Sequence, residues 1–483
     1  MKRALLLAPV VVLALAAVAA GRAARLGGRG APPSAPDPLQ LDSAGAIGRF
    51  AAAIRIPTVS EEDSARRDPR QFAALHQLFD SGFPALRTRL TREAVNQYSL
   101  LYRWPGTDSG AAAVLLAAHQ DVVPADPARW SHAPFSGAIA GGFVWGRGTL
   151  DDKIAVLGVL EAVNALAAEG FRPRRTLYLA FGHDEELGGD AGAAAIAALL
   201  RTRHVALETV LDEGGAILQG VVPGVAVPVA TVGVAEKGSA TLALTAHGAG
   251  GHSSMPPRRT AIGALSQAID RLERDQFPAR LDGASLGLFD AVGPEMAWPY
   301  RVLFANLWLF RPAVLRALTS APSTAAAVRT TIAPTMLQAG IKENVLAPTA
   351  RALVNLRILP GETVASVAER VRRVVDDSTV TVSIVGRGDE PSPVSPVDTA
   401  PYRALATAIR QVYPTAIAAP FLVVGATDAR HYSSLTRNVY RFAPLLLTSA
   451  DLDRLHGVDE RIAIADYLRA VRWYAQVIRN LVR

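Results

Sequence analysis

The sequence contains no cysteine among its 483 residues. This absence excludes a disulfide framework, thiolate catalysis and cysteine-bound zinc, so any metal must bind to His, Asp or Glu side chains. Charged residues make up only 19% of the chain and hydrophobic residues 50%, a composition that excludes an intrinsically disordered protein. A chain of this length can bury a large core and form more than one domain.

Lysine is also scarce, and the basic side chains form no cluster of the kind that binds nucleic acid. The formal net charge is +7, but residues 1–30 hold five basic side chains and no acidic one, which leaves only +2 on the rest of the chain. We therefore expect no nucleic-acid partner.

The first 40 residues have the composition of an export segment and a linker. Lys2 and Arg3 precede an uncharged apolar run over residues 4–20 that ends in small residues. This pattern predicts a signal peptide over residues 1–21 or, if it is not cleaved, an N-terminal membrane anchor. Residues 22–40 are rich in Gly, Ala, Pro and Arg and predict a flexible linker. We expect an exported protein, either periplasmic or secreted, or membrane-anchored and facing outside the cytoplasm.

Residues 41–237 alternate short apolar runs with segments of helical spacing. The strands are predicted at 111–118, 175–181 and 209–211, and the helices at 154–168 and 191–200. This order predicts an α/β domain of three layers with a mixed, mainly parallel sheet. Each strand is followed by polar residues, and in such sheets sites form at the carboxyl ends of the strands.

The pattern changes over residues 238–386, where alternating strands and amphipathic helices predict an inserted α+β domain. Its strands are predicted at 239–246, 351–359 and 379–385, and its helices at 261–272 and 363–375. Within it, residues 277–340 form an apolar segment with several aromatic residues. The first domain is expected to resume over residues 387–483, with helices at 401–412 and 464–479 and a strand at 421–424.

Histidine and carboxylate residues cluster at five places in the chain. The clusters are His119 with Asp121, Asp151 with Asp152, Glu185 with Glu186, Asp212, and His456. Adjacent carboxylates repel each other, and their burial without a counter-charge costs several kcal/mol. Two divalent cations about 3.5–4 Å apart, sharing a bridging carboxylate and a water, would remove that cost. Each cluster alone is also compatible with a structural role, but together they favour a metal site.

The same clusters lie in motifs that resemble the dizinc metallopeptidases, a family that includes aminoacylase, bacterial glutamate carboxypeptidase and succinyl-diaminopimelate desuccinylase. The motifs are HQDVVP at 119–124, WGRGTLDDK at 145–153, GHDEELGG at 182–189, LDEGG at 211–215, GGHSS at 250–254 and GATDAR at 425–430. RTTIA at 329–333, KENVL at 342–346 and VNLRILPG at 354–361 most resemble the branch of Gly-X carboxypeptidase and N-fatty-acyl-amino-acid hydrolase. The resemblance extends over nearly the whole chain after residue 40.

The resemblance implies a centre of two Zn²⁺ ions, for which Co²⁺ or Mn²⁺ are alternatives. It implies that Asp212 and His119 bind one ion, that Glu186 and His456 bind the other, and that Asp151 bridges both. The peptide bond between Asp151 and Asp152 is expected to be cis. Further roles follow for two carboxylates: Asp121 orients His119, and Glu185 acts as the general base.

The inserted domain resembles the family's lid and dimerisation domain, so a homodimer is an expected assembly. The resemblance implies that His252 stabilises the oxyanion, either in a partner subunit or after closure of the lid. Asn344, Arg430 and, more weakly, Arg357 are candidates for contacts with the substrate carboxylate or the oxyanion, because an arginine fork can bind both oxygens of a carboxylate. Ala426 stands where the family often has glycine.

The function implied is zinc-dependent hydrolysis of the amide bond to a C-terminal amino acid, in a short peptide or an N-acyl amino acid. The reaction can also run in reverse at high product concentration. We expect an apolar acyl or penultimate group, for which residues 277–340 are a candidate lining. The alternatives are an aminoacylase or dipeptidase acting on short groups, and a non-catalytic, receptor-like relative.

Overall fold

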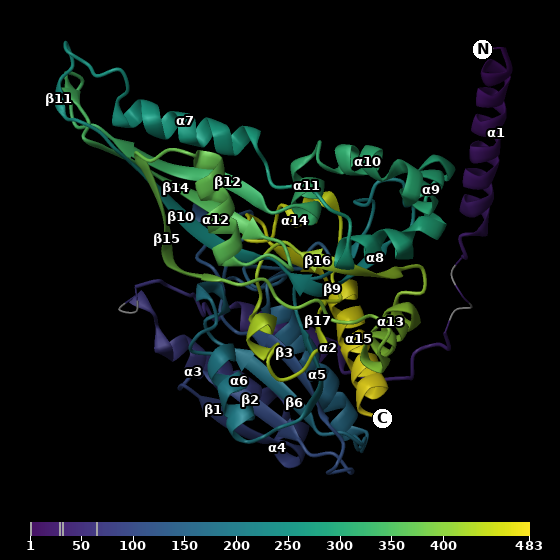
Figure 1. The fold of residues 1–483 in the computed structure, drawn as a ribbon. Coiled ribbons are helices and arrows are strands. Elements are labelled where there is room, and N and C mark those ends of the chain that lie inside the picture. Colours follow the sequence, from purple (N-terminus) through teal and green to yellow (C-terminus); the bar gives the residue numbers. More distant parts are fainter. Residues whose placement is uncertain (1, 29, 31–32, 64–65) are drawn as a thin grey trace.

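The computed structural model describes every residue except 1, 29, 31–32 and 64–65, and describes side chains from residue 11 onward. Figure 1 shows a body built on a large sheet, a second sheet that extends away from it, and the helix α1 (Lys2–Arg25) projecting from the body. Most of the expected export segment thus lies in α1, and its first ten side chains lie outside the described part. Residues 22–25, expected in the linker, are helical.

The large sheet is mixed, and its central strands run parallel. It comprises β1 (Thr91–Val95), β2 (Ser99–Trp104), β6 (Leu177–Gly182), β3 (Ala113–His119), β7 (Leu207–Asp212), β17 (Val439–Arg441), β9 (Val229–Glu236), β8 (Ile217–Leu218) and β18 (Leu446–Leu447) in this spatial order, with β16 (Ile417–Val423) beside β9. β6, β3, β7 and β17 pair in parallel, whereas β1, β2 and β6 pair antiparallel. The predicted mixed, mainly parallel sheet is confirmed.

Helices cover both faces of this sheet, which confirms the three layers. One face carries α2 (Ser43–Ile54), α5 (Lys153–Ala168), α13 (Ala400–Val412) and α15 (Ile464–Val482), and the other carries α6 (Ala193–Thr202) and the 3-10 turn η5 (Asp428–Tyr432). Successive residues of β3 enter opposite cores: Val114 packs on the first face and Leu115 on the second. Because both faces are buried, these strands are continuously apolar.

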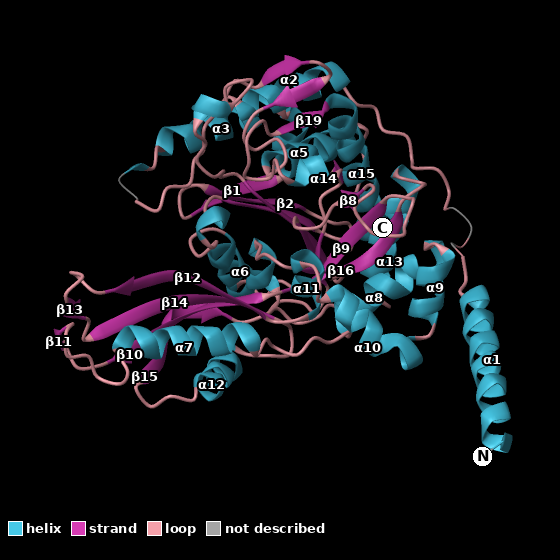
Figure 2. Cartoon of the chain, turned by 90° about the horizontal axis from the view of Figure 1, so that it is seen from above, coloured by secondary structure: helices cyan, strands magenta, loops and turns pink. Residues whose placement is uncertain are grey.

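The inserted segment forms a separate four-stranded sheet, which we call the lid. Its strands lie in the order β12 (Thr331–Ala339), β14 (Thr349–Ile358), β10 (Gly238–His247) and β15 (Val380–Asp389), all antiparallel. The helices α7 (Ala261–Arg274) and α12 (Val364–Val375) pack against this sheet. A small pair, β11 (Gly251–His252) and β13 (Val345–Leu346), lies at the far end of the lid (Figure 2). The α+β character is as predicted, but β12 was not individually expected.

Four short helices fill most of the apolar segment that precedes β12. They are α8 (Gly283–Val292), α9 (Trp298–Ala305), α10 (Leu307–Leu318) and α11 (Pro322–Val328). α8 packs on β16 and β9 of the large sheet, so this part of the 238–386 segment lies against the body and not on the lid sheet.

The remaining elements connect and cover the body. They are α3 (Pro69–Gly82), α4 (Pro84–Arg89), β4 (Ala138–Ala140), β5 (Phe143–Trp145), α14 (Ser449–Leu452) and β19 (Arg461–Ala463), together with the 3-10 turns η2 (Pro127–Arg129), η3 (Glu185–Leu187) and η4 (Gly293–Glu295). Within the described part of the chain, no helix combines the length and the hydropathy needed to cross a membrane.

Candidate metal centre

The ends of three parallel strands bring the predicted residues to one edge of the large sheet. His119 is the last residue of β3 and Asp212 the last residue of β7. Glu185 and Glu186 lie in η3, which follows β6. Because β6, β3 and β7 are parallel neighbours, their carboxyl ends meet at the same edge, where sites form in such sheets.

Asp151 lies at the middle of this group. Its Oδ1 is 2.9 Å from His119 Nε2, and its Oδ2 is 3.0 Å from His456 Nε2. The same His456 nitrogen is 3.3 Å from Glu186 Oε1. The peptide bond between Asp151 and Asp152 is cis, as the resemblance implied. Segments more than 300 residues apart in the sequence thus converge on one aspartate.

Asp121 supports this arrangement from the buried side. Its Oδ1 lies 3.3 Å from His119 Nδ1, and its carboxylate accepts the backbone N–H groups of Glu185 and Glu186, each at 3.2 Å. The Ser60 hydroxyl donates to the same carboxylate. Asp121 therefore fixes both the orientation of the imidazole and the position of the turn that carries the two glutamates.

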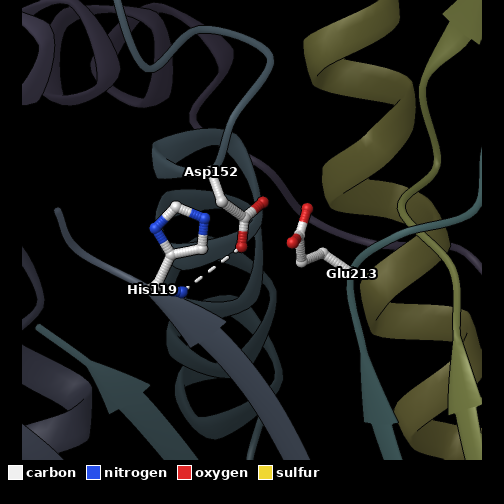
Figure 3. A group of neighbouring side chains, drawn as sticks. All are labelled: His119, Asp152 and Glu213. Atoms are coloured by element: carbon white, nitrogen blue, oxygen red, sulfur yellow. Dashed lines mark hydrogen bonds between the residues drawn. The ribbon is translucent and has the colours of Figure 1, made fainter. Parts of the chain in front are cut away.

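A second group with metal-binding chemistry adjoins the first. The second group consists of His119, Asp152 and Glu213, which place one ligand atom each within 4.8 Å of one another. The same limit holds in the first group for His119, Asp151 and Glu186. Figure 3 shows the carboxylates of Asp152 and Glu213 facing each other beside the His119 ring. The backbone N–H of His119 donates to Asp152 Oδ2 at 3.4 Å. No role was expected for Glu213, although its place directly after Asp212 in LDEGG was a signal.

Several buried carboxylate oxygens in this centre accept no hydrogen bond. They are Asp152 Oδ1 and both carboxylate oxygens of Asp212. A buried acceptor without a partner is costly, and a buried carboxylate without a counter-ion more so. Oxygen and imidazole donors in this number are the ligands that zinc takes, so the residues fit a metal centre.

The raised pKa values of the buried carboxyl groups favour the binding of a cation beside them. Burial raises the pKa of Glu185 to about 8, and the charges of Asp151 and Glu186 add to this effect although His119 opposes it. Burial likewise raises the pKa of Asp212 to about 6 and that of Asp152 well above its usual range. Acids with these values cannot all be ionised at neutral pH unless a cation balances them.

Without a cation, the histidines supply the balancing charge. Hydrogen bonds to Asp151 and Glu186 raise the pKa of His456 to about 10. Burial opposes ionisation of Asp151, but its hydrogen bonds with His119 and His456 outweigh burial and hold its pKa below the usual range. A metal ion would replace these protons, since a ligating imidazole is neutral.

Two buried ion pairs behind the centre were not anticipated from the sequence. Arg147 pairs with Glu460 at 2.5 Å, and Glu460 Oε1 accepts the Leu150 N–H at 2.7 Å, which ties the segment of Asp151 to the segment of His456. Glu236 pairs with Arg441 at 3.2 Å. An isolated acid or arginine in a sequence does not show which partner the fold will give it.

The predicted oxyanion and substrate residues divide between the body and the lid. Arg430 lies in η5 near the centre, where its Nη2 donates to the Gly188 carbonyl at 2.7 Å. His252 is exposed in β11 at the far end of the lid, and Asn344 lies beside it, with its carbonyl accepting the Ser253 N–H at 3.1 Å. Arg357 is exposed on β14. The structure therefore brings only Arg430 near the carboxylate cluster, and both views show the lid end away from the body (Figures 1 and 2).

The chain matches known proteins over most of its length. The model of peptidase family M20/M25/M40 matches residues 115–480. The chain belongs to this family. It is 42% identical to the probable carboxypeptidase S-like 2 of Dictyostelium discoideum, covering 89% of this chain and 84% of that protein. It is 43% identical to the N-fatty-acyl-amino acid synthase/hydrolase PM20D1 of Xenopus tropicalis, with the same coverages. This M20-family chain is thus an enzyme of the metallopeptidase class, and the predicted family is confirmed.

More distant members support the same assignment. Carboxypeptidase S of Saccharomyces cerevisiae is 31% identical, covering 90% of this chain and 84% of that protein. The crystal structure of an M20 family metallo-carboxypeptidase from Sulfolobus solfataricus matches with a TM-score of 0.64 at 17% identity, covering 90% of this chain and 98% of that one. At that identity the structural match supports the fold alone.

Proposed function

We propose that this enzyme hydrolyses the amide bond between an acyl or peptidyl group and a C-terminal amino acid with a free carboxylate. The observation that carries the proposal is the convergence of His119, Asp151, Glu186 and His456 beside Glu185 in a chain of this family. The names of the relatives, carboxypeptidase S and N-fatty-acyl-amino acid synthase/hydrolase, support substrates of this class and a reaction that can also run in reverse.

We propose that the centre holds two Zn²⁺ ions, with Co²⁺ or Mn²⁺ as alternatives. His119 and Asp212 would hold one ion, Glu186 and His456 the other, and Asp151 both. The unpartnered oxygens of Asp212 and the contact between Glu186 and His456 support this assignment. Zinc, when bound, supplies a Lewis acid that polarises a carbonyl and acidifies water.

Glu185 is the proposed general base and acid of the reaction. It would take a proton from the attacking water and deliver it to the nitrogen of the leaving amino acid. Burial and neighbouring carboxylates raise its pKa to about 8. Cations bound beside it would lower this pKa, so that the carboxylate could accept a proton near neutral pH.

The lid is proposed to complete the site. His252 would stabilise the oxyanion after lid closure or from a partner subunit of a homodimer, and Asn344 would approach with it because both lie at the same end of the lid. Arg430, and more weakly Arg357, would bind the substrate carboxylate. The domain limits expected from the sequence, with the lid over 238–386, are part of this proposal. Light scattering of the purified chain tests the dimer.

We also propose export, with residues 1–21 as a signal peptide or anchor. The apolar composition of α1 supports this assignment. Sequencing the N-terminus of the mature protein after cell fractionation distinguishes cleavage from retention. A full-length chain in the cytoplasm would contradict export.

A substrate panel tests the proposed reaction. The purified enzyme is supplied with Zn²⁺ and offered Gly-Leu, N-acetyl-leucine and N-oleoyl-leucine, and free leucine is measured. We expect N-oleoyl-leucine to be cleaved with the highest kcat/KM, because the chain closely matches the fatty-acyl hydrolases.

The panel also separates the alternatives. A preference for N-acetyl-leucine would identify an aminoacylase, and a preference for Gly-Leu a dipeptidase. The Glu185→Gln variant is the control for contaminating activity. Release of no leucine from any of the three would favour the non-catalytic alternative and contradict the proposal.

A further inference from the structure

The segment around α9 and α10 lacks acidic side chains altogether. Residues 296–320, which include α9 and α10, contain no Asp or Glu but three arginines. The sign of this charge points to a partner of negative charge.

The same helices expose large apolar side chains. Trp298 is 52% exposed and Trp308 56%, and Tyr300 and Leu309 are also exposed at 43% and 40%. The other four tryptophans of the chain are buried or half-buried. Exposed aromatic residues grouped on one pair of helices mark an interaction surface, and Trp and Tyr are the residues that favour the boundary between lipid and water.

Helix α1 is fastened to these two helices at its C-terminal end. Arg301 Nε donates to the Ala23 carbonyl at 2.7 Å, and Asn306 Nδ2 donates to the Ala19 carbonyl at 3.0 Å. Trp308 Nε1 donates to Asn306 Oδ1 at 3.2 Å, so this exposed indole lies next to the junction. Trp298 is three residues before Arg301 and shares its face of α9. Trp308 therefore lies next to α1, and Trp298 lies one turn of α9 before a residue that contacts α1.

Beyond the junction, α1 exposes apolar residues of its own. They are Val11, Val12, Leu13, Leu15 and Val18. Figures 1 and 2 show α1 lying beside α9 and projecting past the body. Exposed apolar residues thus lie on α1 and on the neighbouring α9 and α10, and the exposed Arg25 and Arg316 lie at the ends of α1 and α10.

We propose that α1, α9 and α10 form a docking surface for the headgroup region of an anionic lipid bilayer. Trp298 and Trp308 enter the boundary between headgroups and acyl chains, while Arg25 and Arg316 face lipid phosphates. Apolar residues combined with basic charge and no acidic charge fit this partner, because binding there scales with buried apolar area and with attraction to anionic lipids. The surface is independent of the metal centre and of the proposed reaction, and it rests on the alternative in which residues 1–21 are retained as an anchor.

The test measures tryptophan fluorescence of the full chain with lipid vesicles. Vesicles of phosphatidylcholine, with or without phosphatidylglycerol, carry bromine in their acyl chains, which quenches tryptophans that reach the boundary. We expect quenching on the anionic vesicles and its loss in the variant Trp298→Phe/Trp308→Phe, which removes the reporters but keeps apolar rings. We expect Trp298→Ser/Trp308→Ser and Arg25→Glu/Arg316→Glu to bind fewer anionic vesicles in flotation.

A matched control uses exposed apolar residues elsewhere. Met336→Ser/Leu337→Ser, on β12 of the lid, should bind vesicles and be quenched like the wild type. Flotation without quenching of Trp298 and Trp308 would overturn the proposal. The protein would then be attached through α1 alone, with α9 and α10 outside the bilayer. Failure of the wild type to float with anionic vesicles would also overturn it. So would a dimer that forms without lipid and dissociates in the Trp298→Ser/Trp308→Ser variant, because the tryptophans would then form an interface between two copies of the chain.

Discussion

At the scale of residues, the centre contains more buried carboxylates than its two histidines can balance. Asp151 takes the hydrogen bonds of both imidazoles, while Asp152 and Asp212 keep oxygens without partners. Glu185 stands apart from this group because neither of its oxygens is needed to hold an imidazole. The division of labour between Glu185 and its neighbour Glu186 is therefore the first point to test.

Replacement of Glu185 by Gln should abolish proton transfer and leave metal binding unchanged. We expect kcat to fall about 10²–10⁴-fold, the usual contribution of a general base, because the amide cannot accept the proton of the attacking water. Steady-state kinetics with N-oleoyl-leucine, together with the zinc content by mass spectrometry, provide the measurement. Substantial residual turnover with full metal content would remove Glu185 from this role.

Either of the adjacent carboxylates Asp212 and Glu213 could bind the metal ion beside His119. Asp212 has two unpartnered buried oxygens, whereas a Glu213 oxygen lies in a group with His119 and Asp152. We expect Asp212→Asn to lose about one of the two zinc ions, since an amide is a poor ligand, and Glu213→Gln to retain both. Metal analysis of the two isosteric variants compares them directly. The opposite pattern would assign the ligand to Glu213.

At the scale of elements, the hinge between body and lid passes from β9 into β10 through two buried charged residues. Glu236 accepts the Thr427 N–H at 2.9 Å and pairs with Arg441, which joins the hinge to the loop before Arg430. Lys237 Nζ donates to the carbonyls of Ala326 and Arg329, at 3.0 and 2.8 Å, and so fastens the hinge to the end of α11.

Lys237 makes the stability of this hinge dependent on pH. Burial lowers the pKa of Lys237 from 10.5 to about 8, so between these values the unfolded chain binds the extra proton. Stability relative to a Lys237→Met variant should therefore rise as pH rises through this window, by at most about 3 kcal/mol. Denaturant unfolding of both proteins at pH 7.5 and 9.5 measures the difference. The exposed Lys342→Met serves as control, and parallel profiles for wild type and Lys237→Met would contradict the argument.

The elements also show what the sequence could predict. The strand expected at 111–118 is β3 at Ala113–His119, and the helix expected at 154–168 is α5 at Lys153–Ala168, because continuous apolar runs and helical spacing reflect burial directly. The four helices of the apolar segment were not predicted individually, because helices that are apolar on every side show no hydrophobic periodicity in the sequence. The choice between Asp212 and Glu213 depends on where side chains point, which the order of residues does not determine.

At the scale of the whole molecule, the catalytic edge is assembled from both ends of the chain, with the lid inserted between them. Motif order predicted this convergence for His119 and His456. The resemblance implied that His252 reaches a site only after closure of the lid or in a partner subunit. The order of residues did not determine where the lid lies, because domain placement depends on hinge contacts such as those of Lys237. We therefore propose that the lid contributes to the site through closure or a second subunit.

Metal removal should destabilise the entire body. The carboxyl ends of β3, β6 and β7 carry the clustered acids, and a ligand that binds only the folded state stabilises it by mass action. We expect a chelator to lower the thermal midpoint by about 5 °C or more, with recovery on addition of Zn²⁺. Differential scanning calorimetry follows both changes. An unchanged midpoint in a verified metal-free sample would show that the acids are balanced without metal.

Anomalous diffraction from crystals of the active enzyme, recorded at the zinc absorption edge, is the most direct test of the binuclear centre. We expect two peaks about 3.5–4 Å apart, both in contact with Asp151, one beside His119 and one beside His456. A single peak, or an active enzyme with no peak beside Asp151, would contradict this expectation.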